Sequence, residues 1–233
     1  MNIKPLPINA DEHNIIYVTS DGTGDGSSWG NATSELQYAA AVASDGETQV
    51  WVKTGTYYGD VTEANGAFNI YQRNRVYGGF EGDETPDFNI DNRDLKNNPT
   101  ILDGENQRRV INQQDHFGSS AFSIWDGFTI QNGSAGSGGG AYLCSNSYFY
   151  NCSFINNTSN GQGGAIYSVT PLNDHSKNII ENCIFENNTS SMGGAIFDNM
   201  GLTLTNCRFI GNNANTKGGA YYVFMNKFPV VAN

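Results

Sequence analysis

An Asp- and Gly-rich segment near the N-terminus has the spacing of a metal site. Asp21 and Asp25 are placed as in the first half of an EF-hand loop, and calcium prefers carboxylate oxygens as ligands. The position at which such a loop needs a bidentate Glu is Ala32. The pattern therefore favours a glycine-rich turn, and a calcium site at Asp21 and Asp25 is the alternative.

A polar loop is the second candidate. The segment VTPLNDHSK, residues 169–177, contains Pro171, which predicts a protruding loop. Loops inserted into repeat proteins often lie on the face that binds the ligand. Asp174, His175 and Lys177 are therefore candidates for contact with a sugar or an anion. A surface bulge without a ligand is the alternative.

Consecutive aromatic residues form the third candidate. Tyr148, Phe149 and Tyr150 follow one another, and side chains alternate between the two faces of a strand. At least one ring must therefore point outward, where sugars can stack on its face, which makes Tyr148 and Tyr150 candidate ligand-binding residues. Further candidate platforms, for which core packing is the alternative, are Trp29, Trp51, Trp125, Tyr57 and Tyr58.

Four related segments flank the aromatic run and the polar loop. Each combines a short apolar strand, an Asn-rich turn and a Gly-Gly-Ala motif, over residues 127–142, 151–167, 182–197 and 206–222. The segments share two apolar columns, two positions apart, which places both columns on the same inner face of a strand. The first column is Phe128, Cys152, Cys183 and Cys207, and the second is Ile130, Phe154, Phe185 and Phe209. The residues between them, which we expect to face outward, are Thr129, Ser153, Ile184 and Arg208.

This repeat predicts an all-β fold, a single right-handed parallel β-helix. Helical and leucine-rich repeats are excluded because their apolar patterns are absent. Following the period upstream through Ile101 and Val76 to Val50 predicts about seven coils. We expect the Phe column to stack inside and the glycines to form tight corners. An amide ladder is expected at a turn, since Asn both donates and accepts hydrogen bonds and tolerates left-handed backbone, and its members are Asn151, Asn182 and Asn206.

The cysteines fit this fold as small core residues. Cys152, Cys183 and Cys207 are one coil apart and form no Cys-x-x-Cys pair, which disfavours a zinc site. Adjacent coils bring their Cα atoms within disulfide reach, so one bridge is the alternative. Cys144 lies outside the column.

The two ends of the stack differ. Apolar residues at helical spacing predict a helix over 34–44, with Thr33 or Ser34 as its N-cap, that covers the N-terminal end. A strand is expected beside it at 15–18. Residues 227–233 align with the start of another repeat, so we expect a truncated C-terminus whose exposed strand edges permit end-to-end self-association. A natural end with a degenerate last coil is the alternative.

Composition limits the partners and the compartment. The 233 residues carry a net charge of −11, which disfavours nucleic acid as a partner. No apolar run is long enough for a transmembrane helix. The N-terminal residues lack the apolar segment of a signal peptide, which we expect to have been removed. One domain is expected, with the cap over 1–48 and the coils over 49–233.

The motifs resemble those of two groups of proteins. The GGA[IY] motif together with FxxN resembles the repeats of the chlamydial polymorphic outer-membrane proteins. The FxxN pairs are Phe154 and Asn157, Phe185 and Asn188, and Phe209 and Asn212. The segments YVTSDGTGDGSSWGNAT and VYGGFEGDET resemble the N-terminal part of secreted bacterial β-helix proteins of the pectate-lyase-like superfamily. Both resemblances imply an extracellular protein or one at the bacterial cell surface.

Three functions are open at this point. Repetitive architecture, low charge and aromatic residues favour an adhesin-like module that binds carbohydrate or a host or matrix surface. Polysaccharide lyases and glycoside hydrolases that act on acidic glycans share the implied fold. The lyases use Arg or Lys as a base beside calcium, which makes Arg208 and Lys177 catalytic candidates. No carboxylate stands beside Arg208 in its column, which favours binding over catalysis. A passive stalk is the third hypothesis.

Overall fold

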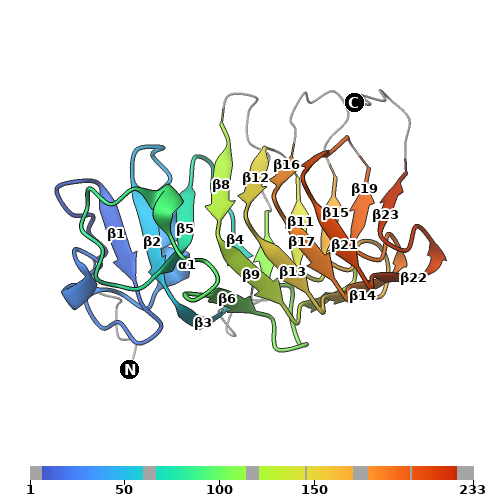
Figure 1. The fold of residues 1–233 in the computed structure, drawn as a ribbon, viewed down its shortest axis with the longest axis horizontal. Helices are drawn as coiled ribbons and strands as arrows, with labels where there is room; N and C mark the ends of the chain where they lie inside the picture. Colours follow the sequence, from blue (N-terminus) through green and yellow to red (C-terminus); the bar gives the residue numbers. More distant parts are fainter. Residues whose placement is uncertain are drawn as a thin grey trace.

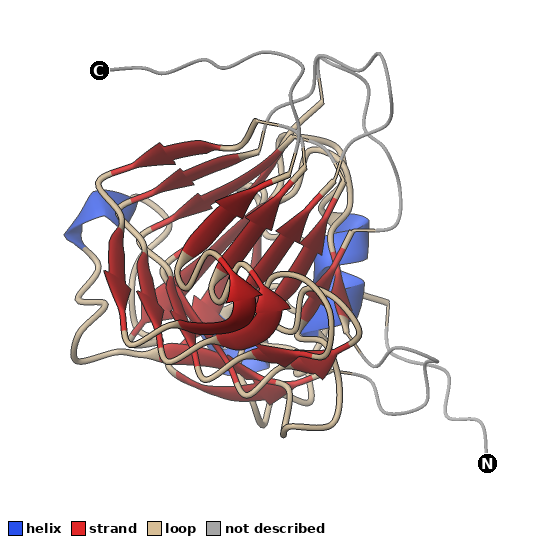
Figure 2. Ribbon diagram, turned by 90° about the vertical axis from the view of Figure 1, so that its right-hand side faces the viewer, coloured by secondary structure: helices blue, strands red, loops and turns tan. Residues whose placement is uncertain are grey.

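The strands of this chain stack in parallel around a common interior. The computed structural model describes residues 7–59, 67–113, 121–144, 146–169, 178–199 and 201–224. Within these residues the strands form four sheets, and every pair of neighbouring strands is parallel. Figure 1 shows the strands side by side along the long axis, and Figure 2 looks along that axis at the strands surrounding the interior. The predicted parallel β-helix is confirmed.

Each sheet collects one strand from each coil. Sheet 1 contains β1 (Ile15–Val18), β2 (Gln49–Lys53), β5 (Arg75–Phe80), β8 (Ser123–Asp126), β12 (Ser147–Tyr150), β16 (Ile179–Glu181) and β20 (Thr203–Thr205). Sheet 2 contains β3 (Gly55–Tyr58), β6 (Thr100–Asp103), β9 (Phe128–Gln131), β13 (Ser153–Ile155), β17 (Ile184–Glu186) and β21 (Arg208–Ile210). Sheet 3 contains β10 (Ser134–Ala135), β14 (Thr158–Ser159), β18 (Thr189–Met192) and β22 (Asn213–Lys217). Sheet 4 contains β4 (Phe68–Asn69), β7 (Ile111–Asn112), β11 (Ala141–Leu143), β15 (Ile166–Ser168), β19 (Ile196–Asp198) and β23 (Tyr221–Val223).

The predicted number of about seven coils is too high, because the two coils assumed at Val76 and Ile101 belong to a single coil. Val76 in β5 pairs with Val50 on one side and with Trp125 on the other. Ile101 lies in sheet 2, where it pairs with Thr129. β5 and β6 are therefore successive strands of the same coil, joined by residues 81–99, and the predicted column at Ile101 is shifted by one residue. From Val50 onward the described part of sheet 1 has six strands, and four coils have a strand in every sheet.

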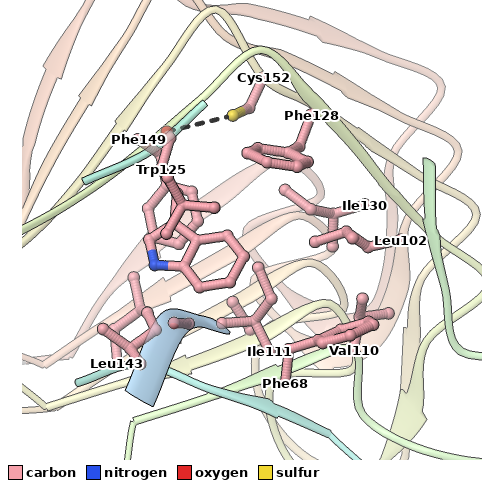
Figure 3. Packing of buried hydrophobic residues seen from close by; sticks show 14 of the residues in the cluster. Phe68, Leu102, Val110, Ile111, Trp125, Phe128, Ile130, Leu143, Phe149 and Cys152 are labelled. Atoms are coloured by element: carbon pink, nitrogen blue, oxygen red, sulfur yellow. Dashed lines mark hydrogen bonds between the residues drawn. The ribbon is translucent and has the colours of Figure 1, made fainter. Parts of the chain in front are cut away.

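The predicted inner columns are confirmed in the repeats. The rings of Phe154 and Phe185 stack at 5.0 Å between centroids, and those of Phe185 and Phe209 stack at 4.9 Å. Cys152 and Cys183 lie buried beneath the neighbouring strands, and all four cysteines are free thiols. Figure 3 shows Phe128, Ile130 and Cys152 of these columns near Trp125 and Phe149 of sheet 1, with the Cys152 Sγ directed at the Trp125 carbonyl. The residues predicted to face outward are exposed or half-buried, and they are Thr129, Ser153, Ile184 and Arg208.

Two amide ladders run along the repeats. In the predicted outer ladder, Asn206 Nδ2 donates to Asn182 Oδ1 at 2.9 Å and Asn182 Nδ2 donates to Asn151 Oδ1 at 3.4 Å, and all three residues have positive φ. An inner ladder joins the FxxN asparagines, of which Asn157 and Asn188 are fully buried. The Asn188 Nδ2 donates to the Phe154 carbonyl at 2.9 Å, while its Oδ1 accepts from the Asn157 backbone N–H at 3.0 Å. The inner ladder thus supplies hydrogen-bond partners to backbone groups at a corner between strands, where strand pairing does not provide them.

The Gly-Gly-Ala motif is required by this corner. Its first glycine has positive φ at Gly163, Gly193 and Gly218, and so does Gly138 at the equivalent position of the first repeat, where Gly140 takes the place of the alanine. Its second glycine lies against the next coil, since a Cβ on Gly194 would collide with the Gly219 carbonyl oxygen. Both predicted reasons for glycine, the left-handed backbone and the close approach, are therefore present.

A helix and an edge segment cover the N-terminal end. β1 occupies the predicted residues, and helix α1 (Leu36–Val42) packs its apolar side on β1 and β2. The free edge of β1 exchanges backbone hydrogen bonds with Gly26 and Thr33. The predicted cap is wrong, because the N-cap is Glu35 and its side chain makes no capping bond. Thr33 is not the N-cap because its backbone pairs with the edge of β1 at Val18. Its Oγ1 nevertheless accepts a hydrogen bond from the Glu35 N–H at 3.1 Å. Within the described residues there are also two short 3-10 helices, η1 (Trp29–Asn31) and η2 (Ile90–Asn92).

Candidate functional site

Aromatic rings gather on the outer face of sheet 1. Phe149 points into the core, whereas Tyr148 and Tyr150 stand on the opposite face of β12, as the alternation predicts. The ring of Tyr148 stacks on that of Phe122 at 5.2 Å between centroids and meets the ring of Tyr150 edge-on at 6.4 Å. Partial burial, and then the charge of Glu181, raise the pKa of Tyr150. We call Phe122, Tyr148 and Tyr150 the aromatic strip.

A hollow of about 280 Å³ adjoins the aromatic strip. Three successive coils of sheet 1 build it, at the residues that come just before or at the start of β2, β5 and β8. Its walls are formed by Asp45, Gly46, Glu47, Arg73, Arg75 and Phe122. Phe122 belongs to both features, so the hollow and the aromatic strip form one continuous surface.

An Asp-turn shapes one wall of the hollow. The carboxylate of Asp45 accepts hydrogen bonds from the backbone N–H groups of Glu47 and Thr48, each at 2.8 Å, and from the Thr48 hydroxyl at 2.7 Å. Partial burial alone would raise the pKa of Asp45, but these hydrogen bonds together lower it. Gly46 has a φ of +88°, and a Cβ there would stand 3.3 Å from the Arg73 Cδ. The carboxylate of Asp45 is thus engaged in its own turn, and that of Glu47 is exposed.

Three of the six arginines of this chain have partners within the protein. Arg93 forms a buried ion pair with Asp126 at 3.0 Å, and Arg108 pairs with Glu105. The guanidinium of Arg109 donates to the carbonyls of Gly138 and Ser137 at 3.0 and 2.8 Å and to the side chain of Asn112. By contrast, within the described part of the chain, the side chains of Arg73 and Arg75 take part in no ion pair or hydrogen bond. Their donors are therefore available to a ligand in the hollow.

The predicted calcium site is occupied by a turn. The carboxylate of Asp25 accepts from the Ser27 N–H at 3.0 Å, from Asn9 Nδ2 at 3.0 Å and from Asn31 Nδ2. Hydrogen bonds from the side chain of Ser27 first, then from Asn9 and the Ser27 N–H, lower the pKa of Asp25. Among the described residues no three His, Cys, Asp or Glu side chains lie together as metal ligands. The geometry fits the glycine-rich turn, and calcium binding by Asp21 and Asp25 stays an untested prediction.

Among the residues that the structure describes, none of the other sequence candidates lines the hollow. Arg208 lies exposed on β21 in sheet 2, where it pairs with Ile184 of the preceding coil. Lys177, Asp174 and His175 lie outside the described residues, as do residues 227–233. Among the other aromatic candidates, Trp51, Trp125 and Tyr57 are buried, in agreement with the core-packing alternative. Trp29 is half-buried, and Tyr58 on sheet 2 is 56% exposed.

Sequence reasoning missed the hollow. Arg73 and Arg75 are close together in the chain, but Arg73 lies in the turn before β5 with a φ of +63°, so strand alternation could not place its side chain. Their approach to Phe122 could not be read from the sequence. Val76 of β5 pairs directly with Trp125 of β8, although a long connection separates these two residues along the chain.

Comparison with known proteins finds a family model that matches two of the repeat segments. Residues 151–169 and 182–199 match the family model of the Chlamydia polymorphic membrane protein repeat. No match to the chain was found among curated proteins, and none among solved structures. In the described part of the chain, no helix has the length and apolarity needed to cross a membrane. The chain is thus a parallel β-helix that carries two segments similar to these Chlamydia repeats.

Proposed function

We propose that this chain is a surface-displayed bacterial module that binds carbohydrate through the outer face of sheet 1. The observation that carries the proposal is the aromatic strip, whose rings stand outward on a rigid sheet beside the hollow. Aromatic rings held by packing present large apolar faces at little cost in conformational entropy. The match to the Chlamydia polymorphic membrane protein repeat supports the setting at a bacterial surface. The ligand class is a polysaccharide or a cell-surface glycan.

A binding screen with one matched pair of variants tests this proposal. The protein is titrated with neutral and acidic oligosaccharides in a calorimeter. Tyr148→Ala should weaken binding about tenfold, because it removes the central ring of the strip. The control is Tyr58→Ala, which deletes an exposed ring on sheet 2. Equal losses in both variants, or no binding to any glycan, would contradict the proposal, and circular dichroism checks that both variants are folded.

A turnover assay separates binding from catalysis. The same polymers are incubated with calcium or with a chelator, and the absorbance of unsaturated uronide products is followed. A flat trace is expected. Calcium-dependent product would favour the lyase alternative, and Arg208 and Lys177 would then be the residues to test as the catalytic base.

A further inference from the structure

We propose that the outer face of β12 and β16 binds an amino sugar, with its protonated amine between the ring of Tyr150 and the carboxylate of Glu181. This inference rests on the proposed carbohydrate binding and names its ligand class, a glycan that carries free amines. An ammonium group is attracted both by the face of an aromatic ring and by a carboxylate.

Four side chains of two neighbouring strands build this site. Tyr148 pairs with Ile179 and Tyr150 pairs with Glu181, and Figure 1 shows β12 and β16 side by side. The residue between the members of each strand is buried in the core, so alternation places all four side chains on the outer face of sheet 1. Tyr148 and Ile179 form an apolar half, and Tyr150 and Glu181 form a polar half. A sugar ring with one apolar face and a charged substituent matches both halves at once.

The two carboxylates beside Tyr150 differ in their partners. Asp126 precedes Tyr150 in the same column. Its carboxylate already pairs with Arg93 at 3.0 Å and accepts from Asn151 Nδ2 at 2.9 Å. Glu181 follows Tyr150 in the column, and among the described residues its half-buried side chain takes part in no ion pair or hydrogen bond. A cation at the ring of Tyr150 therefore finds one carboxylate free to pair with it, on the side of β16.

The charges around the site favour a cation. A net charge of −11 attracts a basic glycan at long range. Arg75 pairs with Ile124, which in turn pairs with Tyr148, so two strand spacings, roughly 10 Å, separate the backbones of Arg75 and Tyr148. Arg75 also shares the hollow with the carboxylates of Asp45 and Glu47. Its repulsion of an amine at β16 is therefore weak, because salt screens exposed charges over such distances.

The test compares an amine with its acetylated form. The probes are tetraglucosamine, titrated at mildly acidic pH where its amines are protonated, and tetra-N-acetylglucosamine, which keeps the sugar rings without the charge. The protein should bind the amine about tenfold more tightly. Glu181→Gln should abolish this preference and leave the binding of the acetylated form unchanged, which also shows that the variant is folded.

A matched control lies in the same coil. Glu186 is the last residue of β17, as Glu181 is of β16, and both side chains are half-buried. The neighbours of Glu186 in its column are Ile155 and Ile210, and neither is aromatic. Glu186→Gln removes the same charge away from the tyrosines, so this variant should keep the preference for the amine.

The outcomes separate this inference from the proposed function. Equal binding of the amine and the acetylated form, weakened by Tyr148→Ala, would overturn the role of Glu181 and keep the aromatic strip. An equal loss of the preference in Glu186→Gln would assign it to the general charge of the chain and overturn the inference. Binding of tetralysine as tight as that of tetraglucosamine would overturn the sugar as the recognised ligand. Binding of neither sugar would also overturn the inference, whereas the proposed function fails only if the wider screen finds no glycan.

Discussion

The repeats over residues 121–224 and the irregular region over 7–113 are held together differently. In the repeats, identical side chains stack from coil to coil, as the rings of Phe154 and Phe185 do. In the irregular region, single side chains complete the packing, such as Asn74, whose Nδ2 donates to the carbonyls of Ala40 and Ala43 at the end of α1. Repetition supplies a stiff frame, whereas the irregular coils supply the turns that form the hollow.

Arg93 is one of the residues that contact both regions. Arg93 follows η2 in the long connection between β5 and β6 and donates to the Gly78 carbonyl at 2.7 Å. Its ion pair with Asp126 continues into the outer ladder, because Asn151 Nδ2 donates to the same carboxylate at 2.9 Å. The amide ladder of the repeats therefore begins at a side chain of the irregular region.

The largest effect is expected from breaking the aromatic stack. Phe185→Ala should lower the free energy of unfolding by about 3–5 kcal/mol, because it opens a cavity between two stacked rings. Chemical denaturation followed by circular dichroism measures this loss. The matched control is Phe209→Ala in the last described coil, where the ring is half-buried and the loss should be smaller. A loss below about 1 kcal/mol for Phe185→Ala would contradict the inward column.

Breaking the inner ladder should cost somewhat less. Asn188→Ala leaves the Asn157 N–H and the Phe154 carbonyl without their partners in a buried corner. Each such group costs roughly 1–3 kcal/mol, so we expect a total of about 2–4 kcal/mol. The same denaturation experiment measures it. A neutral result would mean that water or a shifted backbone replaces the amide.

The outer ladder should matter least among these columns. Asn182→Gly keeps the positive φ and loses only exposed hydrogen bonds, so a loss below about 1 kcal/mol is expected. Asn182→Ala should cost more, because a left-handed backbone costs a residue with a Cβ roughly 1–2 kcal/mol. Equal losses of stability in the two variants would show that Asn182 stabilises the fold through its amide and not through its tolerance of positive φ.

The smallest effect concerns the turn beside the hollow. The folded state lowers the pKa of Asp45 below its ordinary value of 3.8, so its contribution to stability is present above that pH. The contribution is lost as the pH falls from 3.8 through the lower pKa of the folded state. Unfolding midpoints measured across this range should fall less steeply in Asp45→Asn than in the parent protein. Identical slopes would contradict the role of this carboxylate.

Much of the repeat region could be predicted from its sequence, and little of the irregular region could. The columns at Phe154 and Asn182 follow from period and residue type, because like residues stack when coils repeat. The position of Ile101 could not be found in the same way, since residues 81–99 lengthen one coil and hide the period. The outward position of Tyr148 followed from alternation, but its partner Phe122 did not.

The sequence by itself determined the parallel β-helix, the inward columns and the Asn and Gly corners, because each of these depends on local backbone preference repeated along the chain. The tertiary structure alone decided the coil to which each irregular segment belongs, and with it the meeting of Arg73, Arg75 and Phe122. The physical reason is that strand pairing joins residues far apart in the chain, and its register depends on the packing of the whole core.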